Sequence, residues 1–291
     1  MKKGLIGVQM STIAPNKMPK FDAYESMAKL ADIGYKCIEI SQVPMSKENV
    51  AGFRRAIDEL GFNVAAVSAT VKSNPMMPSE ELCNPDDFKK MVDDAKALDC
   101  DMMRIGSMPM DARFSLQAAI DFAKQADEYA CQLAEHGIDL YYHNHHFEFA
   151  RHGGKFLMDI IKENTTRLGF ELDIHWIHRG GMDPVKFINQ YAGRIRLLHL
   201  KDYRIGHMAL PEEDINTPEG MKKVYAAMNN IVEFAEVGEG TLDIPACIEA
   251  GLNGGSEYFL VEQDMSYVRD PFDCLKTSHD NLVKMGYGDW F

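Results

Sequence analysis

The chain has 291 residues, 46% hydrophobic and 26% charged, which suits a folded protein with a sizeable core and excludes a disordered one. Its 44 acidic and 31 basic side chains give a formal net charge of −13, which repels phosphate backbones and anionic membrane surfaces. No stretch approaches the roughly 20 apolar residues that a membrane span needs. We therefore expect neither nucleic acid nor a membrane as a partner.

Cysteine usage and the first residues both favour a cytoplasmic protein. The six cysteines are scattered, without a CxxC pair or the Cys/His spacing of a zinc module, as expected for free thiols in a reducing compartment. The opening MKKGLIGVQM begins with basic residues, but its apolar run is short and ends in polar residues. It is therefore interpreted as a first strand and not as a signal peptide.

Eight short runs rich in Ile, Val, Leu and Tyr recur along the chain, separated by longer segments with helical spacing of apolar residues. Helical patterns at 21–34, 47–61 and 115–137 each end at a glycine, a residue that readily closes a helix. The predicted strands cover 5–10, 35–40, 63–69, 101–107, 138–145, 168–175, 195–202 and 258–264.

Strict alternation of strand and helix indicates parallel strands, and eight such units close a (β/α)₈ TIM barrel. We expect one α/β barrel domain over 1–291, with a doubly wound open sheet as the alternative. The connection from 202 to 258 is unusually long, and we expect it to form an elaborated loop at the barrel mouth.

Polar residues in the last four predicted strands fall at positions that face the barrel interior. Barrel strands alternate between interior and helix layer, so the apolar residues fix the direction of their neighbours. The carboxyl ends of these strands form the mouth where barrel enzymes carry their sites. The inward-facing polar residues are Tyr141, His143, His145, Asp173, His199, Lys201, Glu262 and Asp264.

Each of these residues also has a structural explanation when taken alone. A strand-end His is often a hydrogen-bonded core residue, and Asp173 would cap the following helix. Together, burying Asp173, Glu262 and His199 without a cation would cost several kcal/mol in desolvation and repulsion. The convergence therefore predicts a divalent metal ion.

Five segments in order carry a family resemblance: YHNHHFEF, ELDIHWIHRGGMDP, LLHLKD, EVGEGTLDIP and FLVEQD. They resemble the sugar phosphate isomerase/epimerase group of xylose-isomerase-like barrels over essentially the whole chain. The resemblance implies one divalent cation, often Mn²⁺, held by a Glu, an Asp, a His and a Glu on strands five to eight. The last three of these ligands fall on Asp173, His199 and Glu262.

The chain departs from this pattern at strand five, where HNH replaces the usual Glu and puts His143 in the ligand position. A mixed imidazole and carboxylate set suits Mn²⁺, Co²⁺, Fe²⁺ or Zn²⁺ better than Mg²⁺. Since two metal-bound glutamates act as acid and base in the better-studied epimerases of the group, one of them is missing here. We expect Glu262 to be the base and His145 or Glu148 to be the second proton carrier.

Four further residues are predicted near the substrate. Trp176 stands where some epimerases have a substrate-binding His, and an aromatic platform for a sugar face is a reasonable substitute. Lys201 would stabilise negative charge on a substrate oxygen, or else neutralise carboxylates such as Asp264. Glu39 and Arg104 are predicted substrate contacts, with a structural ion pair as the alternative for each.

The leading functional hypothesis is a metal-dependent isomerase or epimerase of a small keto-sugar, in which a base removes the proton α to a carbonyl. A lyase or dehydratase acting on a 3-keto-sugar would begin with the same step. An endonuclease IV-like phosphodiesterase would need more ligands and a basic surface, and a sugar sensor would bind without turnover. The oligomeric state stays open, and a homo-oligomer is compatible with the sequence.

Overall fold

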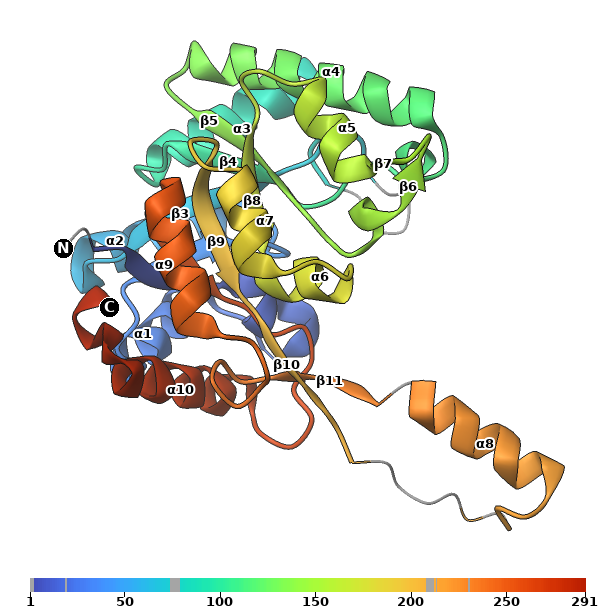
Figure 1. Ribbon diagram of the computed structural model, residues 1–291. Coiled ribbons are helices and arrows are strands. Elements are labelled where there is room, and N and C mark those ends of the chain that lie inside the picture. The colour runs from blue at the N-terminus through green and yellow to red at the C-terminus, as the bar shows by residue number, and fades with distance from the viewer. Residues whose placement is uncertain (1–2, 19, 74–78, 208–211, 213, 230) are drawn as a thin grey trace.

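Eight parallel strands close into a barrel in the order β1-β12-β9-β8-β5-β4-β3-β2 (Figure 1). The computed structural model describes residues 3–18, 20–73, 79–207, 212, 214–229 and 231–291. The predicted barrel is confirmed, and the open sheet is wrong. The strands are β1 (Leu5–Gln9), β2 (Cys37–Ile40), β3 (Asn63–Ala69), β4 (Met102–Ile105), β5 (Asp139–His143), β8 (Gly169–Asp173), β9 (Ile195–Leu200) and β12 (Tyr258–Val261).

Helices pack around the outside of the barrel, so each strand is covered on both faces and carries a nearly continuous buried run. Ser46 and Ser115 cap α2 and α4 by accepting hydrogen bonds from backbone N–H groups. Gly34, Gly61 and Gly137 follow α1, α2 and α4 with positive φ angles of 128°, 72° and 78°. The helices are α1 (Ala23–Ile33), α2 (Lys47–Leu60), α3 (Pro85–Ala97), α4 (Leu116–Ala134), α5 (Leu157–Glu163), α6 (Ile174–Arg179), α7 (Pro184–Gln190), α9 (Ile244–Gly254) and α10 (Pro271–Leu282).

The long connection after β9 is a projecting arm. Strands β10 (Asp202–Ile205) and β11 (Val232–Ala235) form an antiparallel ribbon, and α8 (Pro218–Asn229) lies beyond it, away from the barrel (Figure 1). The arm starts at the carboxyl end of β9, as expected for an elaboration of the mouth, although parts of the connection (208–211, 213 and 230) lie outside the described residues.

A short hairpin lies outside the barrel sheet. Strands β6 (Arg151–His152) and β7 (Lys155–Phe156) form a short hairpin between β5 and α5. Within the described part of the chain, no helix is both long enough and apolar enough to cross a membrane.

The barrel order places the predicted site on four adjacent strands. β5, β8, β9 and β12 neighbour one another, and Asp173 at the end of β8 lies in register with His199 on β9. On the other side of His199, the register partner is Leu260 of β12, two residues before Glu262. The carboxyl ends of these strands therefore bring their polar residues to one place.

Candidate metal centre

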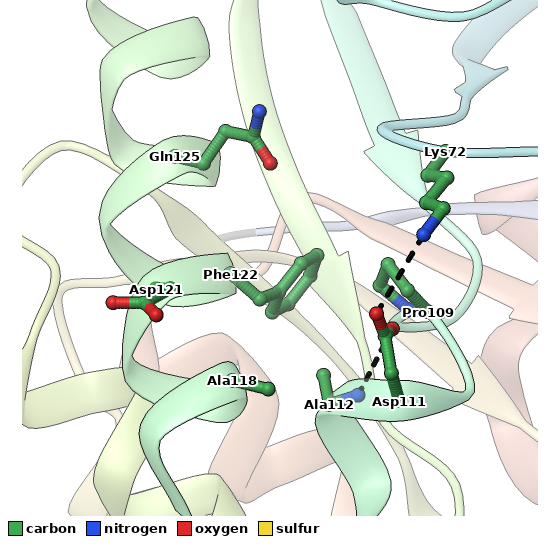
Figure 2. Close-up of a pocket in the computed structure, with 8 residues that line it drawn as sticks. All are labelled: Lys72, Pro109, Asp111, Ala112, Ala118, Asp121, Phe122 and Gln125. Atoms are coloured by element: carbon green, nitrogen blue, oxygen red, sulfur yellow. Dashed lines mark hydrogen bonds and ion pairs between the residues drawn. The ribbon is translucent and has the colours of Figure 1, made fainter. Parts of the chain in front are cut away.

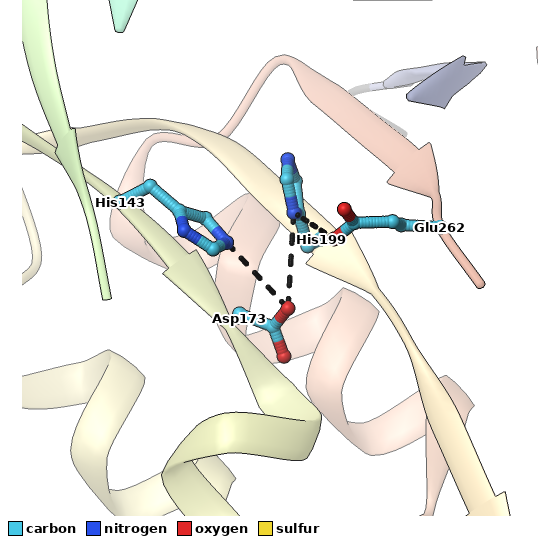
Figure 3. A group of neighbouring side chains, drawn as sticks. All are labelled: His143, Asp173, His199 and Glu262. Carbon is cyan, nitrogen blue, oxygen red and sulfur yellow. Dashed lines mark hydrogen bonds and ion pairs between the residues drawn. The ribbon is translucent and has the colours of Figure 1, made fainter. Parts of the chain in front are cut away.

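Four side chains, one from the end of each of these strands, meet at the barrel mouth (Figure 3). His143, Asp173, His199 and Glu262 each offer one ligand atom, and these atoms lie within 4.8 Å of one another. Nδ1 of His199 lies 3.0 Å from Oε2 of Glu262, and Nε2 of His143 lies 3.6 Å from Oδ2 of Asp173. All four residues are buried. The structure thus brings together the four predicted ligands.

The hydrogen bonding of this ligand set leaves atoms free for a cation. Both ring nitrogens of His143 and Oδ2 of Asp173 are buried without a hydrogen bond, and an unsatisfied buried group such as the His143 ring costs about 1–3 kcal/mol. The other Asp173 oxygen accepts a hydrogen bond from the Trp176 backbone N–H and caps α6. One oxygen of Asp173 therefore caps α6, and the other faces the ligand cluster. Two imidazoles and two carboxylates fit a divalent transition metal.

The protonation states suit metal binding at three of the four ligands. Burial lowers the pKa of His143 to about 4, with a further contribution from His199, so its imidazole is neutral near pH 7. Burial alone would raise the pKa of Asp173 and Glu262, but Lys201 and the neighbouring histidines hold both below their ordinary values. Both carboxylates are therefore ionised.

His199 differs, because it carries a proton when no metal is bound. Burial opposes its charge, but the carboxylates of Glu171, Glu39 and Glu262 raise its pKa well above the ordinary value. Its Nε2 lies 3.1 Å from Oε1 of Glu171 and 3.2 Å from Oε2 of Glu39. Those contacts fix the ring orientation and leave Nδ1 facing Asp173 and Glu262.

Glu39 and Arg104 lie beneath His199 and pair with each other. Nε of Arg104 donates to Oε1 of Glu39 at 2.7 Å, and its Nη2 donates to Oγ of Ser41 at 2.8 Å. Glu39 is fully buried and Arg104 is 4% exposed. The structure thus favours the structural ion pair over substrate contact for both residues.

Lys201 is surrounded by carboxylates. Its Nζ lies 2.7 Å from Oε2 of Glu262, 3.0 Å from Oδ2 of Asp264 and 3.4 Å from Oδ2 of Asp173. Burial alone would lower the pKa of Lys201, but the three carboxylates raise it above the ordinary value, so the side chain stays charged. This geometry matches the alternative interpretation, in which Lys201 neutralises surplus negative charge.

The two candidates for second proton carrier lie in different environments. Both carboxylate oxygens of Glu148 are occupied: one accepts from the Tyr142 hydroxyl and the other from the His145 backbone N–H. The His145 ring stacks on Phe147 at 5.2 Å and contacts His143 edge to face at 4.8 Å. Burial lowers the pKa of His145 well below its ordinary value, and its Nδ1 has no hydrogen-bond partner. His145 is therefore a neutral group beside the ligand set.

An aromatic surface borders the site. Trp176 of α6 lies 5.9 Å from Phe234 of the ribbon and 5.0 Å from His146, between ring centroids. Nζ of Lys201 lies 5.0 Å from the centroid of the Trp176 ring. Trp176 thus lies beside the charged cluster, and its role as a platform stays a prediction.

Several polar residues of the site escaped the sequence prediction. Gln9, the last residue of β1, and Ser11, two residues beyond it, donate to Oε1 of Glu262 at 2.8 and 2.9 Å. Asn144 accepts a hydrogen bond from the Asp173 backbone N–H. Glu171 lies two residues before Asp173 on β8, and its shared inward parity was the signal available for it. Burial and the charge of Glu39 raise the pKa of Glu171 to about 8.

A family model described as xylose isomerase-like TIM barrel matches residues 27–276, a range that includes all four clustered ligands. The chain belongs to this family. No curated protein sequence matches the chain.

Solved structures agree with the family's fold over nearly the whole chain. A sugar phosphate isomerase/epimerase from Parabacteroides distasonis is 18% identical, covering 96% of this chain and 93% of its own, with a TM-score of 0.68. The probable 3-DHS dehydratase AsbF of Bacillus anthracis is 14% identical, covering 96% and 98%, with a TM-score of 0.66. An L-ribulose 3-epimerase is 13% identical, covering 99% and 95%, with a TM-score of 0.64. At these identities the likeness establishes the barrel fold alone.

Proposed function

We propose that this barrel is a divalent-metal-dependent isomerase or epimerase acting on a small keto-sugar or its derivative. The observation that carries the proposal is the buried ligand set, in which atoms of His143 and Asp173 make no hydrogen bond, next to the ionised carboxylate of Glu262. The fold relatives include a protein named as an isomerase/epimerase and another named as an epimerase, which is consistent with this chemistry. Mn²⁺ is the proposed ion, with Co²⁺, Fe²⁺ or Zn²⁺ as alternatives.

In the proposed reaction Glu262 removes the proton α to the substrate carbonyl. Gln9 and Ser11 hold one oxygen of Glu262, which fixes the direction of the carboxylate. A cation held by the four ligands would stabilise the negative charge that develops on the substrate oxygen. His145, neutral and lacking a partner at Nδ1, is the proposed second proton carrier.

The surroundings of Glu262 support substrate binding at the mouth. Trp176 offers its ring to the apolar face of a sugar, while its backbone N–H fixes Asp173. Lys201 stays charged between Glu262 and Asp264, so it balances the carboxylates before and after proton transfer.

Elimination is a second candidate reaction, favoured by His143. Where the family resemblance implies a second metal-bound glutamate, this chain has the imidazole of His143, so Glu262 is the one glutamate in the ligand set. Loss of water from a 3-keto-sugar needs one base for the α proton and one acid for the leaving oxygen; Glu262 would take the α proton and, once protonated, would pass it to the leaving oxygen. The two reactions share their first step and differ in product.

The test is turnover of keto-sugars in D₂O by metal-loaded protein. We expect solvent deuterium at the carbon next to the carbonyl, and Glu262→Gln should lower that exchange by about 10²-fold or more. Glu257→Gln, at the opposite end of the same barrel strand, is the matched control and should exchange normally. An epimer as product supports the first reaction, and an unsaturated product supports elimination. Undiminished exchange in Glu262→Gln would reject both.

A further inference from the structure

Exposed large apolar side chains are concentrated in two places. Of the twelve in the described residues, eleven belong to two groups, and the twelfth is Val283. The arm patch consists of Ile205, Ile215, Met221, Tyr225 and Met228. The rim patch consists of Met110, Phe114, Leu116, Met265, Tyr267 and Val268. Exposed apolar surface gathered in this way marks an interaction site.

The arm patch includes one face of α8. Met221, Tyr225 and Met228 follow one another at spacings of four and three residues, so they share a side of the helix, and they are 37%, 58% and 52% exposed. Figure 1 shows α8 at the far end of the ribbon, away from the barrel. A helix held in this position leaves its apolar face in water.

The base of the ribbon is fixed, which sets the direction of the arm. Both side-chain oxygens of buried Asp202 accept backbone hydrogen bonds, and the N–H groups come from Tyr203, Gly238, Gly240, Thr241 and Leu242. Nε of Arg204 pairs with Glu233 across the ribbon at 3.2 Å. These contacts fix the direction in which the ribbon leaves the barrel, and along that direction α8 lies away from its own barrel (Figure 1).

The rim patch flanks the mouth on two sides. Phe114, 78% exposed, follows β4, whereas Val268, 95% exposed, follows β12, and these strands stand four places apart in the closed barrel. Beside the first loop, Figure 2 shows a pocket in which Phe122 of α4 faces Pro109. The rim therefore carries exposed apolar side chains on two sides of the mouth, with a pocket beside the loop after β4.

We propose that the arm of one copy crosses the barrel mouth of a second copy, with the apolar face of α8 on the rim patch, reciprocally in a twofold dimer. Stable interfaces use roughly 20–30 residues per partner. A reciprocal contact brings both patches of each chain into the interface, with the polar residues between them making up the remainder. The second copy is the fitting occupant because each chain carries both an apolar arm patch and an apolar rim patch. The mouth above the ligand set is then closed by the partner, whatever reaction it performs.

Sedimentation velocity tests the dimer with matched variants. Wild-type protein should be dimeric at micromolar concentration. The arm variant Tyr225→Glu/Met228→Glu and the rim variant Phe114→Glu/Val268→Glu should each weaken association by about 100-fold or more, because carboxylates would be buried unpaired. Val283→Glu, an exposed apolar position outside both patches, should leave the dimer intact. A monomeric wild type, or a dimer that survives either double variant, overturns the proposal.

Mixing the two double variants tests the arm-to-rim pairing itself. The arm variant keeps its rim and the rim variant keeps its arm, so a mixed dimer regains one intact contact. We expect the mixture to associate more tightly than either variant alone. No gain on mixing would rule out the arm-to-rim arrangement, and circular dichroism of each variant confirms that it is folded.

Discussion

Glu148→Gln should stabilise the protein, and more so as the pH rises. Glu148 is fully buried, and burial raises the pKa of its carboxyl to about 7 from an ordinary value of 4.5. Glutamine has the same shape, and its oxygen can still accept from the His145 backbone N–H. Its amide would donate to the Tyr142 hydroxyl, which can reverse its role. The substitution thus removes a buried charge without emptying the site.

The magnitude follows from the two pKa values. Below about pH 4.5 the carboxyl is protonated in both folded and unfolded chains, so it carries no penalty. Between about pH 4.5 and 7 the unfolded chain loses the proton first, and the folded state becomes progressively less stable. At 1.36 kcal/mol per pKa unit the full penalty is about 3 kcal/mol above pH 8, and it is below about 1 kcal/mol near pH 5.

Urea unfolding of wild type and Glu148→Gln at about pH 5 and about pH 8.5 measures this directly. The free-energy difference between the two proteins should grow with pH. A difference that is the same at both pH values would refute the buried-charge argument. Turnover should fall by less than about tenfold in the variant, since we assign proton transfer to His145; loss of a proton carrier would cost about 10²-fold or more.

Three further predictions concern the metal, the ribbon and the aromatic platform. Metal binding near pH 7 should release about one proton, from His199, whose pKa is raised by Glu171, Glu39 and Glu262; titration calorimetry in buffers of different ionisation enthalpy would detect it, and binding without release contradicts the assignment. Asp202→Ala should lower the free energy of unfolding by about 3 kcal/mol, because five backbone N–H groups lose their acceptor. If urea unfolding gave a loss under about 1 kcal/mol, water would be replacing the Asp202 carboxylate as acceptor. Trp176→Ala should raise KM by about tenfold with a smaller change in kcat; the opposite split in steady-state kinetics would argue against a binding platform.

The barrel and its ligand set were predictable because both follow from the alternation of residues along each strand and from the order of the strand and helix units. Strand-end residues such as Asp173 and His199 could be oriented from the apolar residues beside them, and eight alternating units determine which strands are neighbours. Glu171 shares that parity but lies one layer deeper, where barrel interiors are usually apolar. Parity alone does not reveal a carboxylate placed there to hold His199.

Residues beyond strand ends were harder to place, because alternation stops with the strand. Glu148 is three residues past His145, but a 3₁₀ turn (Phe147–Phe149) directs its carboxylate back to Tyr142. Gln9 ends β1 and Ser11 lies two residues beyond it; both are uncharged and far from the other site residues in sequence. The sequence predicted a loop where the arm lies, and its ribbon was missed. Neither strand of the ribbon exceeds four residues, and each is defined by pairing with the other.

The most direct test of the central claim is the metal content of protein purified without chelator. The four-ligand centre predicts about one divalent ion per chain, and His143→Ala and His199→Ala should each retain far less, since loss of a ligand weakens binding strongly. His152→Ala, outside the ligand set, should bind as wild type does. A wild type without stoichiometric metal after incubation with Mn²⁺, Co²⁺, Fe²⁺ or Zn²⁺, or full occupancy in His199→Ala, would contradict the account.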